Sequence, residues 1–573
     1  MEAARIESLQ GIKGYPLEPN TYSSSKGLYI SSRHKSSMKK SLVFEVLFLT
    51  ILFLFSVYMW SLPIKNNPLP YGEVDSAHHF GIADYITEKD MIGEFYKPAF
   101  LYFLYSQRSI LGGGKISTES PYPPNFFINE AIAQIIGGDR VASYYLFLAI
   151  LCTSVILSSY FFIRKLFGVI PAFLSTLLIM ASKIDILTFI MGQYVILVSF
   201  ACLPLILYCY YKYINSFLTR KPKPIYLYIM AFFLATQYFN HFWSLVDTAV
   251  TLLIFTIFLI IKEKKFPFSI KHATIALVIF FVVLGPFIHK SVMSLQVEMF
   301  SGTAATDISD NWLGLFKWYT SGYAKIAVGQ EIFSYKEMHG QWTLPLLIIG
   351  VLFLLLRRKR EDLLLLSWLL ALYIILHFDI FLGWGASRLF RSVNDVPYIF
   401  YPLTAIGFMG VLALIKVQFR IKKYIKYAFI AIFLVLFVNF NLKLSFEMLD
   451  KAYQYPLRIN PSQYQAALWM KENIDENSIV YPQGTLIPKT KRFIRVVSHI
   501  TNLEYDDDLE LLRSLHPDLN ISITHYFVDY SELIMFGMKK EMEALQQWEK
   551  TNFANISPIY DKNNIRIYDV RNK

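Results

Sequence analysis

Long apolar runs recur along most of this chain of 573 residues. A helix needs about 20 apolar residues to cross the roughly 30 Å hydrocarbon core of a bilayer, and many of these runs approach that length. Within lipid, the backbone polar groups of such a run must be satisfied internally, which favours helices. Together with a hydrophobic content of 54%, this pattern excludes an ordinary soluble protein. The sequence therefore predicts a polytopic α-helical membrane protein.

We expect about eleven transmembrane helices. The first apolar run lies too far from the start of the chain to be a usual signal peptide, so it should remain as an anchor. The predicted spans are 42–62, 142–163, 169–187, 190–211, 225–241, 244–261, 273–289, 342–356, 363–382, 398–415 and 424–442.

Basic residues gather in every second loop, as in Arg357-Arg358-Lys359-Arg360, whereas the other short loops hold little more than Lys183, Arg388 and Arg391. The positive-inside rule then places the N-terminus in the cytoplasm. An odd number of spans places the C-terminus outside, beyond the cell membrane or in the lumen of the endoplasmic reticulum. The net charge of +12 thus reflects topology, and we expect no nucleic-acid partner.

Three regions face the external side at length, and the last is polar enough to be a soluble domain. Its apolar patterns predict helices over 461–473 and 541–552, strands over 478–481 and 523–529, and a hairpin of 557–560 with 565–570. This is a small α/β or α+β module. The predicted organisation is a disordered cytoplasmic tail (1–40), a membrane domain (41–444) with external loops (63–141 and 290–341), and an extracytoplasmic domain (445–573).

The three cysteines, Cys152, Cys202 and Cys209, all fall inside apolar runs. We expect buried free thiols there, without a disulfide framework or a zinc site.

The segment Tyr71–Gly81 follows the first span and carries two carboxylates and two imidazoles, on Glu73, Asp75, His78 and His79. Ionisable groups so close to a span end tend to mark substrate paths. If Asp75 caps a helix, its carboxylate lies at the positive end of the helix dipole. The alternative is that Asp75 is only a helix cap and the histidines are solvated.

At these residues the chain resembles the GT-C superfamily of membrane glycosyltransferases. Glu73-Val74-Asp75, followed by Tyr85-Ile86, resembles the first-loop motif of the oligosaccharyltransferase catalytic subunit. Asp75-Ser76-Ala77-His78 is also similar to the D-E-x-H stretch of protein O-mannosyltransferases. The many spans, the cytoplasmic N-terminus and the external C-terminal domain extend the resemblance beyond the motif.

The resemblance implies a transferase that takes a sugar from a polyprenyl-phosphate carrier. Asp75 would be the base on the acceptor or a metal ligand, Glu73 a supporting carboxylate, and His78 and His79 substrate contacts. Glycosyl transfer needs an activated acceptor and a stabilised phosphate leaving group. Carboxylates could also hold Mg²⁺ or Mn²⁺ through oxygen ligands.

A second acid, Asp185, lies in Ser182-Lys183-Ile184-Asp185 at the external end of the third span. The oligosaccharyltransferase pattern has D-x-D there, and Lys183 replaces the first acid. Asp185 is a candidate substrate contact and a second metal ligand, and Gln193 a further substrate contact. The alternative is an interfacial Lys183–Asp185 pair whose charged ends reach toward water.

Arg388 and Arg391 depart from the charge pattern of the external loops. A guanidinium group matches phosphate oxygens, so either arginine could bind the lipid phosphate, or both could anchor lipid head groups. The tail contains no W-W-D-Y-G-like motif, which leaves a protein, lipid or glycan acceptor open.

Two other functions remain open from the sequence. One is a transporter or flippase of lipid-linked saccharides, although transporters usually place charges within spans. The other is a non-catalytic assembly subunit that keeps the fold, which the missing second acid allows.

Overall fold

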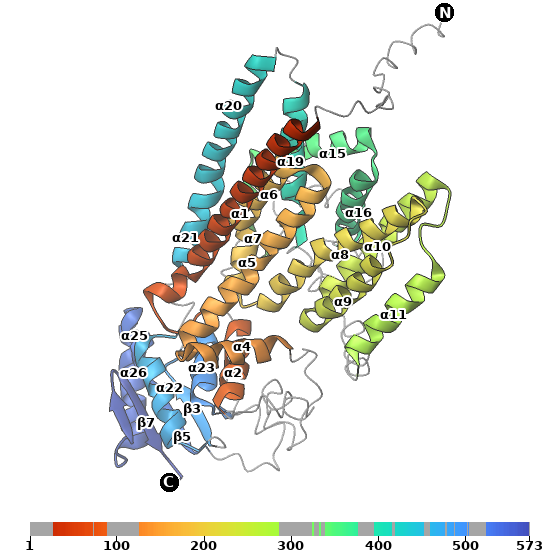
Figure 1. Ribbon diagram of the computed structural model, residues 1–573. Helices are drawn as coiled ribbons and strands as arrows, with labels where there is room; N and C mark the ends of the chain where they lie inside the picture. Colours follow the sequence, from red (N-terminus) through yellow and green to blue (C-terminus); the bar gives the residue numbers. More distant parts are fainter. Residues whose placement is uncertain are drawn as a thin grey trace, which may run out of the picture. The chain divides into compact units, whose positions relative to one another are not determined.

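The computed structural model describes the helical and folded parts of the chain and shows a largely helical protein (Figure 1). The described residues are 27–571, except 73, 89–124, 286–323, 326–331, 334–338, 376–394, 415–418, 452–458, 476–477, 486–487, 501 and 504–522.

Among the described residues, seven helical segments are long and apolar enough to cross a bilayer, which supports the predicted integral membrane protein. They coincide with seven of the predicted spans, extended by a few residues at most ends. The segments are Leu42–Lys65, Arg140–Phe167, Val169–Ile190, Tyr194–Leu218, Ser244–Glu263, Val396–Ala413 and Tyr424–Asp450.

The other four predicted spans coincide with shorter helices, so the number eleven stays a prediction. These helices are α9 (Ile225–Asn240), α11 (Ile270–Leu284), α15 (Thr343–Arg357) and α16 (Arg360–Ile375). The longer segments lie in α1 (Gly27–Asn66), α5 (Arg140–Phe167), α6 (Val169–Met180), α7 (Lys183–Ile190), α8 (Tyr194–Leu218), α10 (Phe242–Glu263), α19 (Val396–Leu414), α20 (Phe419–Phe437) and α21 (Lys443–Lys451). Helix α1 begins inside the tail that was expected to be disordered.

Glycines bring two membrane helices, α15 and α19, into backbone contact. A Cβ atom on Gly350 would lie 2.0 Å from the carbonyl oxygen of Leu403, and one on Gly407 would lie 1.8 Å from that of Leu346. Small residues allow such close packing between helices in lipid.

The third span is broken between α6 and α7. Ser182 caps α7, because its Oγ accepts a hydrogen bond from the backbone N–H of Asp185 at 3.3 Å. Opposite the break, a π-helical turn, η5 (Val438–Leu442), leads into α21, where Ser445 Oγ donates to the carbonyl oxygen of Ala181 at 2.8 Å. The break and the last span therefore hold one another.

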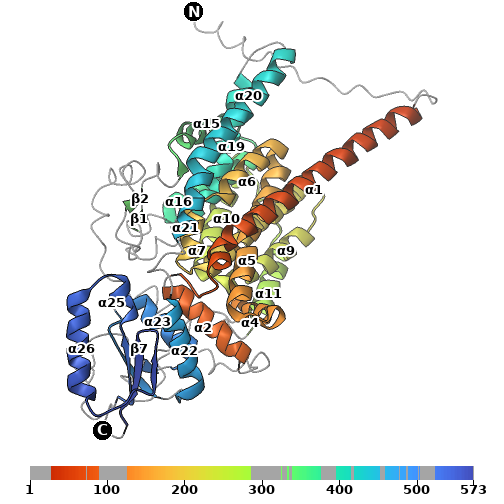
Figure 2. The same ribbon diagram turned by 90° about the vertical axis from the view of Figure 1, so that its left-hand side faces the viewer.

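The C-terminal region folds around a sheet with the strand order β4-β3-β5-β7-β6. β4, β3 and β5 are parallel, whereas β7 pairs antiparallel with both β5 and β6. Figure 2 shows α26 on one face of the sheet and α22 and α23 on the other. The elements are α22 (Pro461–Asn473), β3 (Ile479–Gln483), α23 (Pro488–Ser498), β4 (Asn502–Leu503), β5 (His525–Asp529), α25 (Ser531–Met535), α26 (Lys539–Phe553), β6 (Tyr560–Lys562) and β7 (Ile565–Asp569).

This region matches the predicted α/β module closely. Helix α22 has the predicted bounds, and β3, β5, α26 and β7 begin and end within two residues of the predicted positions. β6 begins at the last residue of the strand predicted over 557–560. The sequence analysis missed α23, β4 and α25. Two further short strands, β1 (Ala324–Lys325) and β2 (Ile332–Phe333), pair antiparallel within the segment 290–341, which the sequence predicts as an external loop.

The cysteines are free thiols. Cys152 and Cys209 are buried as expected, whereas Cys202 is partly exposed.

Candidate functional site

The motif after the first span opens a helix, α2 (Val74–Glu88). Asp75 is the second residue of α2, so it lies inside the first turn and is not the cap that the sequence suggested. It still occupies the positive end of the helix dipole. Glu73 lies outside the described residues, and the side chains of Asp75 and His78 are not described.

Buried hydroxyl groups hold the first turn of α2. Ser76 Oγ donates to the carbonyl oxygen of Tyr71 at 2.6 Å and lies 2.7 Å from the hydroxyl of Tyr194. The hydroxyl of Tyr145 donates to the same carbonyl oxygen at 2.8 Å, and its ring stacks on that of Tyr71 with centroids 4.3 Å apart. All four side chains are fully buried. The helix that carries Asp75 therefore starts from a rigid polar core.

The turn between α7 and α8 lies directly against this first turn. Gly192 has a φ of +83°, and a Cβ atom there would lie 2.1 Å from the backbone nitrogen of Ser76. Gly72 has a φ of +112°, and a Cβ atom there would lie 2.7 Å from the Ser76 side chain and 2.9 Å from the carbonyl oxygen of Ile190. Only glycine fits such contacts without displacement. Gln193, the residue before α8, is half-buried and directly follows Gly192 in this turn.

His79 is buried in an aromatic environment rather than solvated. Its ring stacks on Phe127 with centroids 5.2 Å apart and meets Phe126 edge-on. Both phenylalanines belong to α4 (Asn125–Gly137), which packs against α2 and α5.

One turn beyond Phe127, α4 carries Glu130, which the sequence analysis missed. Its carboxyl group is fully buried, and neither oxygen has a hydrogen-bond partner in the described part of the chain. Burial raises the pKa of Glu130 well above its usual value, and the adjacent hydroxyl of Tyr144 opposes this only in part. The available signal was a lone acid in an otherwise apolar helix.

Asp185 is buried within α7. Its Oδ1 accepts a hydrogen bond from the hydroxyl of Tyr398 on α19 at 2.9 Å. Oδ2 has no hydrogen-bond partner among the residues that the structure describes. Asp185 therefore pairs with a tyrosine of the tenth predicted span. The side chains of Asp185 and Lys183 are both buried.

A second buried acid, Asp395, lies just before α19 and was not singled out from the sequence. Its Oδ2 accepts a hydrogen bond from the indole nitrogen of Trp368 at 2.8 Å. It interacts electrostatically with Asp185 and with Asp247 of α10. Carboxyl groups of α7, of α10 and of the residue before α19 thus lie close enough to interact electrostatically.

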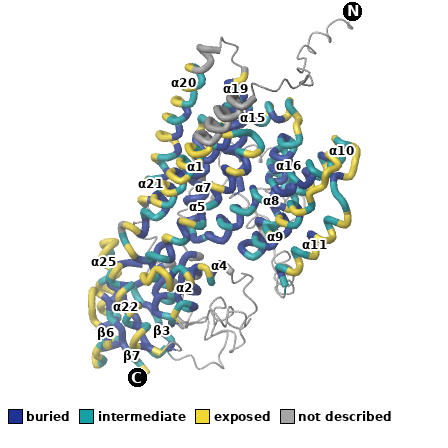
Figure 3. Tube along the Cα trace, viewed as in Figure 1, coloured by how far each residue is buried: buried dark blue, intermediate teal, exposed yellow. Residues whose placement is uncertain are grey.

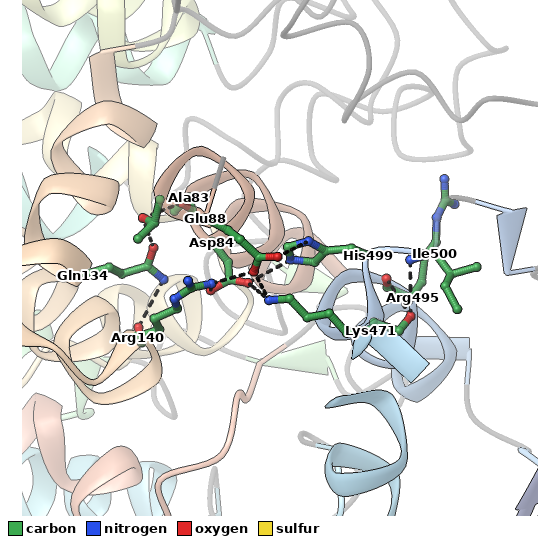
Figure 4. A network of polar contacts seen from close by, with 11 residues as sticks. Ala83, Asp84, Glu88, Gln134, Arg140, Lys471, Arg495, His499 and Ile500 are labelled. Atoms are coloured by element: carbon green, nitrogen blue, oxygen red, sulfur yellow. Dashed lines mark hydrogen bonds and ion pairs between the residues drawn. The ribbon is translucent and has the colours of Figure 1, made fainter. Parts of the chain in front are cut away.

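The other end of α2 carries a charged cluster (Figure 4). Asp84 and Glu88 share one face of the helix, as residues four apart do. Arg140 of α5 bonds both carboxylates, at 3.1 Å and 2.8 Å. From the C-terminal region, Lys471 reaches both acids, and His499 Nε2 lies 2.9 Å from Asp84 Oδ2.

Charge compensation dominates the electrostatics of this cluster. Burial alone would raise the pKa of Asp84, but the hydrogen bond with His499 and the charges of Lys471, His499 and Arg140 lower it to about 2. The pKa of Glu88 is also lowered, because hydrogen bonds from Lys471 and Arg140 outweigh its partial burial. Both carboxylates are therefore ionised at neutral pH.

Helix α23 approaches α2 closely beside this cluster. A Cβ atom on Gly81 would lie 2.7 Å from the side chain of Val496. The cluster and this contact join α2 to the C-terminal region, a junction that the sequence did not predict.

The same cluster has a geometry that could hold a metal ion. Asp84, Glu88 and His499 each offer one ligand atom, and these atoms lie within 4.8 Å of one another. Carboxylate oxygen and imidazole nitrogen suit zinc or manganese. Lys471 and Arg140 already neutralise both acids, so a metal ion would have to displace at least one of them.

In the part of the chain that the structure describes, some of the predicted site residues lie close together. The start of α2, with Asp75, and Gln193 meet at the turn between α7 and α8, and His79 faces α4 one turn away. Arg388 and Arg391 lie outside the described residues, so their placement stays a prediction.

The fold is similar to two solved membrane proteins. The archaeal oligosaccharyltransferase AglB from Archaeoglobus fulgidus aligns with a TM-score of 0.56 and 14% identity, over 88% of this chain and 71% of that one. ArnT from Cupriavidus metallidurans aligns with a TM-score of 0.52 and 10% identity, over 93% of this chain and 98% of that one. The chain therefore shares the fold of these two proteins, which is the GT-C-like fold that the sequence led us to expect.

The sequence also matches a protein family. A model of DUF6541, a family of unknown function, matches residues 24–480, and the chain belongs to this family. None of the curated proteins compared with the sequence matches it.

Several structures of these two proteins contain bound ligands. The AglB structure contains an inhibitory peptide and dolichol-phosphate, and a second ArnT structure contains undecaprenyl phosphate. Another structure of the Archaeoglobus enzyme, with a TM-score of 0.52 and 13% identity over 87% of this chain and 69% of that one, is a complex with zinc and sulfate.

Proposed function

We propose that this protein is an integral membrane glycosyltransferase. It moves a sugar from a polyprenyl-phosphate-linked donor to a protein, lipid or glycan acceptor on the extracytoplasmic face. The observation that carries the proposal is the start of α2. Asp75 occupies the first turn of a helix that is fixed by buried hydroxyls and by the glycine contact of the turn between α7 and α8.

The fold and the lipids support this choice of donor. Both similar proteins have been solved with a polyprenyl phosphate bound. A polyprenyl chain partitions into the bilayer, which holds the donor in the plane where the spans of this protein lie.

In the proposed reaction Asp75 acts on the acceptor, with Glu73 as a supporting carboxylate. Asp75 takes the proton of the acceptor nucleophile, whose electron pair forms the new bond to the anomeric carbon of the sugar. The bond from that carbon to the phosphate oxygen breaks, and the polyprenyl phosphate leaves with the electron pair. Arg388 or Arg391 stabilises its charge.

His78, His79 and Gln193 are the proposed contacts to substrate. Gln193 belongs to the turn that touches the first turn of α2, and His79 lies one helical turn beyond Asp75. They would orient the sugar relative to the base, which is a large part of the rate gain in such transfers.

We propose that Asp185, together with Asp75, would hold a divalent ion, Mg²⁺ or Mn²⁺. The buried Oδ2 of Asp185 has no hydrogen-bond partner within the described residues, which leaves a hard oxygen ligand. Such an ion would offset negative charge on the leaving phosphate.

The C-terminal region is proposed to position the acceptor. It contacts α2 through Lys471, His499 and α23, so it lies beside the helix that carries the proposed base. The positive-inside pattern places α2 and this region on the extracytoplasmic face, with the N-terminus in the cytoplasm.

The proposal is tested with the full chain reconstituted in proteoliposomes. The probes are dolichyl-phosphate mannose and undecaprenyl-phosphate glucose, added with a membrane extract of a deletion strain as acceptor source. We expect sugar to appear in the extract and polyprenyl phosphate to be released. Asp75→Asn should abolish both, whereas Glu541→Gln, an exposed acid on α26, should change neither.

Full transfer by Asp75→Asn would remove Asp75 from the mechanism. Movement of the intact donor across the bilayer without release of polyprenyl phosphate would overturn the enzyme in favour of a flippase. Unchanged glycans and glycolipids in a deletion strain, together with no turnover of either probe, would favour a non-catalytic subunit.

A further inference from the structure

The C-terminal region exposes three consecutive large apolar side chains. Ile534, Met535 and Phe536, which we term the apolar tip, are 50%, 48% and 46% exposed. Figure 3 shows buried and exposed segments of the C-terminal region, which carries α25. Other large apolar residues exposed in the described part of this region, such as Leu468 and Ile559, occur singly. Scattered exposed apolar residues need no explanation, but a continuous run outside the membrane usually serves an interaction.

The apolar tip is held out rigidly by the end of α25. The N–H of Met538 donates to the carbonyl oxygen of Leu533 at 2.9 Å, and the N–H of Gly537 donates to that of Ile534 at 3.1 Å. With a φ of +66° at Gly537, these two bonds form a Schellman motif.

The apolar residues around this motif form a buried group and an exposed group. Leu533 is buried in the domain core and Met538 packs against that core, so the turn directs both inward. The residues between them, which form the apolar tip, are directed outward. Exposure of the tip therefore follows from a well-bonded turn and not from a frayed helix end.

Positive charge adjoins the apolar tip. Lys539 and Lys540 are exposed at the start of α26, directly after the turn. The exposed acid Glu541 follows Lys540 directly, and a second exposed acid, Glu543, lies two residues farther along the helix. Apolar side chains flanked by lysines suit the surface of a bilayer, where the chains enter the acyl boundary and the ammonium groups meet lipid phosphates.

The chain also keeps α25 near the bilayer. Asn460 Nδ2 donates to Ser531 Oγ, at the start of α25, with a distance of 2.9 Å. Asn460 follows Asp450, the end of the last candidate span, by only ten residues. Even fully extended, ten residues reach about 35 Å.

We propose that the apolar tip enters the interfacial layer of the membrane, with Lys539 and Lys540 at the lipid phosphates. The C-terminal region then has a second attachment to the bilayer besides its chain connection. This contact is independent of the proposed transferase activity.

The test uses the full chain in lipid nanodiscs, with the three native cysteines replaced by alanine. A fluorescent NBD group is attached at Met535→Cys or, as a matched control, at Lys562→Cys, which is exposed in strand β6 on the same sheet domain. We expect a blue-shifted emission at position 535, quenching by doxyl-labelled lipids, and several-fold weaker quenching by aqueous iodide than at position 562.

The charge contribution is tested with Lys539→Glu/Lys540→Glu. This double variant should reduce lipid quenching at position 535 in discs that contain phosphatidylglycerol, and much less in discs of phosphatidylcholine alone. Equal iodide quenching at both positions, without lipid quenching, would overturn the proposal. So would protection at position 535 that vanishes when each disc holds one chain, since the tip would then contact a second copy.

Discussion

Nε2 of His499 lies 2.9 Å from Oδ2 of Asp84, although 415 positions separate the two residues in the sequence. This contact joins the segment after α23 to the last turns of α2. Because the proposed base, Asp75, lies in the first turn of the same helix, the position of α2 depends on groups from both ends of the chain. Disruption of the charged cluster should therefore affect both α2 and the C-terminal region.

Asp84→Asn should destabilise the protein at neutral pH by about 2 kcal/mol, because the folded state lowers the pKa of Asp84 from 3.8 to about 2. A lowered pKa means that the ionised carboxylate is favoured in the folded state. Its contribution is complete above about pH 4 and is lost as the pH falls toward 2. Thermal unfolding in detergent, followed by tryptophan fluorescence, measures the difference between the variant and the wild type.

The difference in stability between Asp84→Asn and the wild type should shrink as the pH falls from 4 to 2, over the pH range in which both proteins are folded. Glu543→Gln, an exposed acid, should leave stability unchanged at either pH. An Asp84→Asn protein as stable as the wild type at pH 7 would show that the cluster does not stabilise the fold.

Lys471→Ala should make the cluster bind zinc more tightly. Lys471 pairs with Asp84 and Glu88, two of the three groups that could hold a metal ion. Removing the ammonium group leaves negative charge that a cation can compensate. We expect zinc to raise the unfolding temperature of Lys471→Ala more than that of the wild type, reversibly with EDTA.

Adding His499→Ala to Lys471→Ala should abolish the zinc effect, because a ligand is lost. An equal zinc response in the wild type and in both variants would place the metal elsewhere.

Gly192→Ala should be much more damaging than Gly138→Ala. Both glycines have positive φ, +83° and +77°, so alanine costs about 1 kcal/mol at either position. A Cβ atom at position 192 would also lie 2.1 Å from the backbone of Ser76, whereas nothing lies within 4 Å of one at position 138. The yield of folded protein by size-exclusion chromatography, and its unfolding temperature, measure the difference.

Equal effects of the two alanines would mean that the turn between α7 and α8 does not press on α2. If Gly192→Ala still folds, it should have a lower kcat than the wild type in the proposed transferase. The reason is that Asp75 lies next to Ser76, whose backbone the added Cβ atom would displace.

Tyr398→Phe and Asp185→Asn should distinguish a structural role of Asp185 from a role in sugar transfer. Removing the Tyr398 hydroxyl leaves the buried Asp185 carboxyl without its donor, which costs about 1–3 kcal/mol. Asp185→Asn retains an oxygen that accepts this hydrogen bond, so it should be nearly as stable as the wild type. If Asp185 binds substrate or metal, only Asp185→Asn should lose transfer while it remains folded.

Tyr210→Phe provides a matched control, because it removes a hydroxyl that contacts Thr256 away from α2. Normal transfer by Asp185→Asn would exclude Asp185 from the site.

Much of the architecture could be predicted from local patterns. The span Tyr194–Leu218 and the helix Pro461–Asn473 are recognisable because apolar spacing and length are properties of a short segment. Asn460 and Pro461 likewise indicate the start of α22 from local sequence, and Asn460 and Gln463 form a capping box there. The short helix α25 carries no comparable pattern and was missed.

The candidate site could be predicted only in part. The acids after the first span were visible as a local cluster, whereas Glu130 and Asp395 looked like single polar residues. Their burial, and the pairing of Asp185 with Tyr398, arise from helices that meet across long stretches of chain.

The sequence alone determined that this chain is a membrane protein, where most of its helices lie, and that an acidic motif follows its first span. Those properties depend on neighbours along the chain. The tertiary structure alone decided that α2 is held by Arg140, Lys471 and His499, and that Gly192 touches Ser76. Ion pairs and close contacts act over a few ångströms in space, and no local pattern states which distant residues will come within that range.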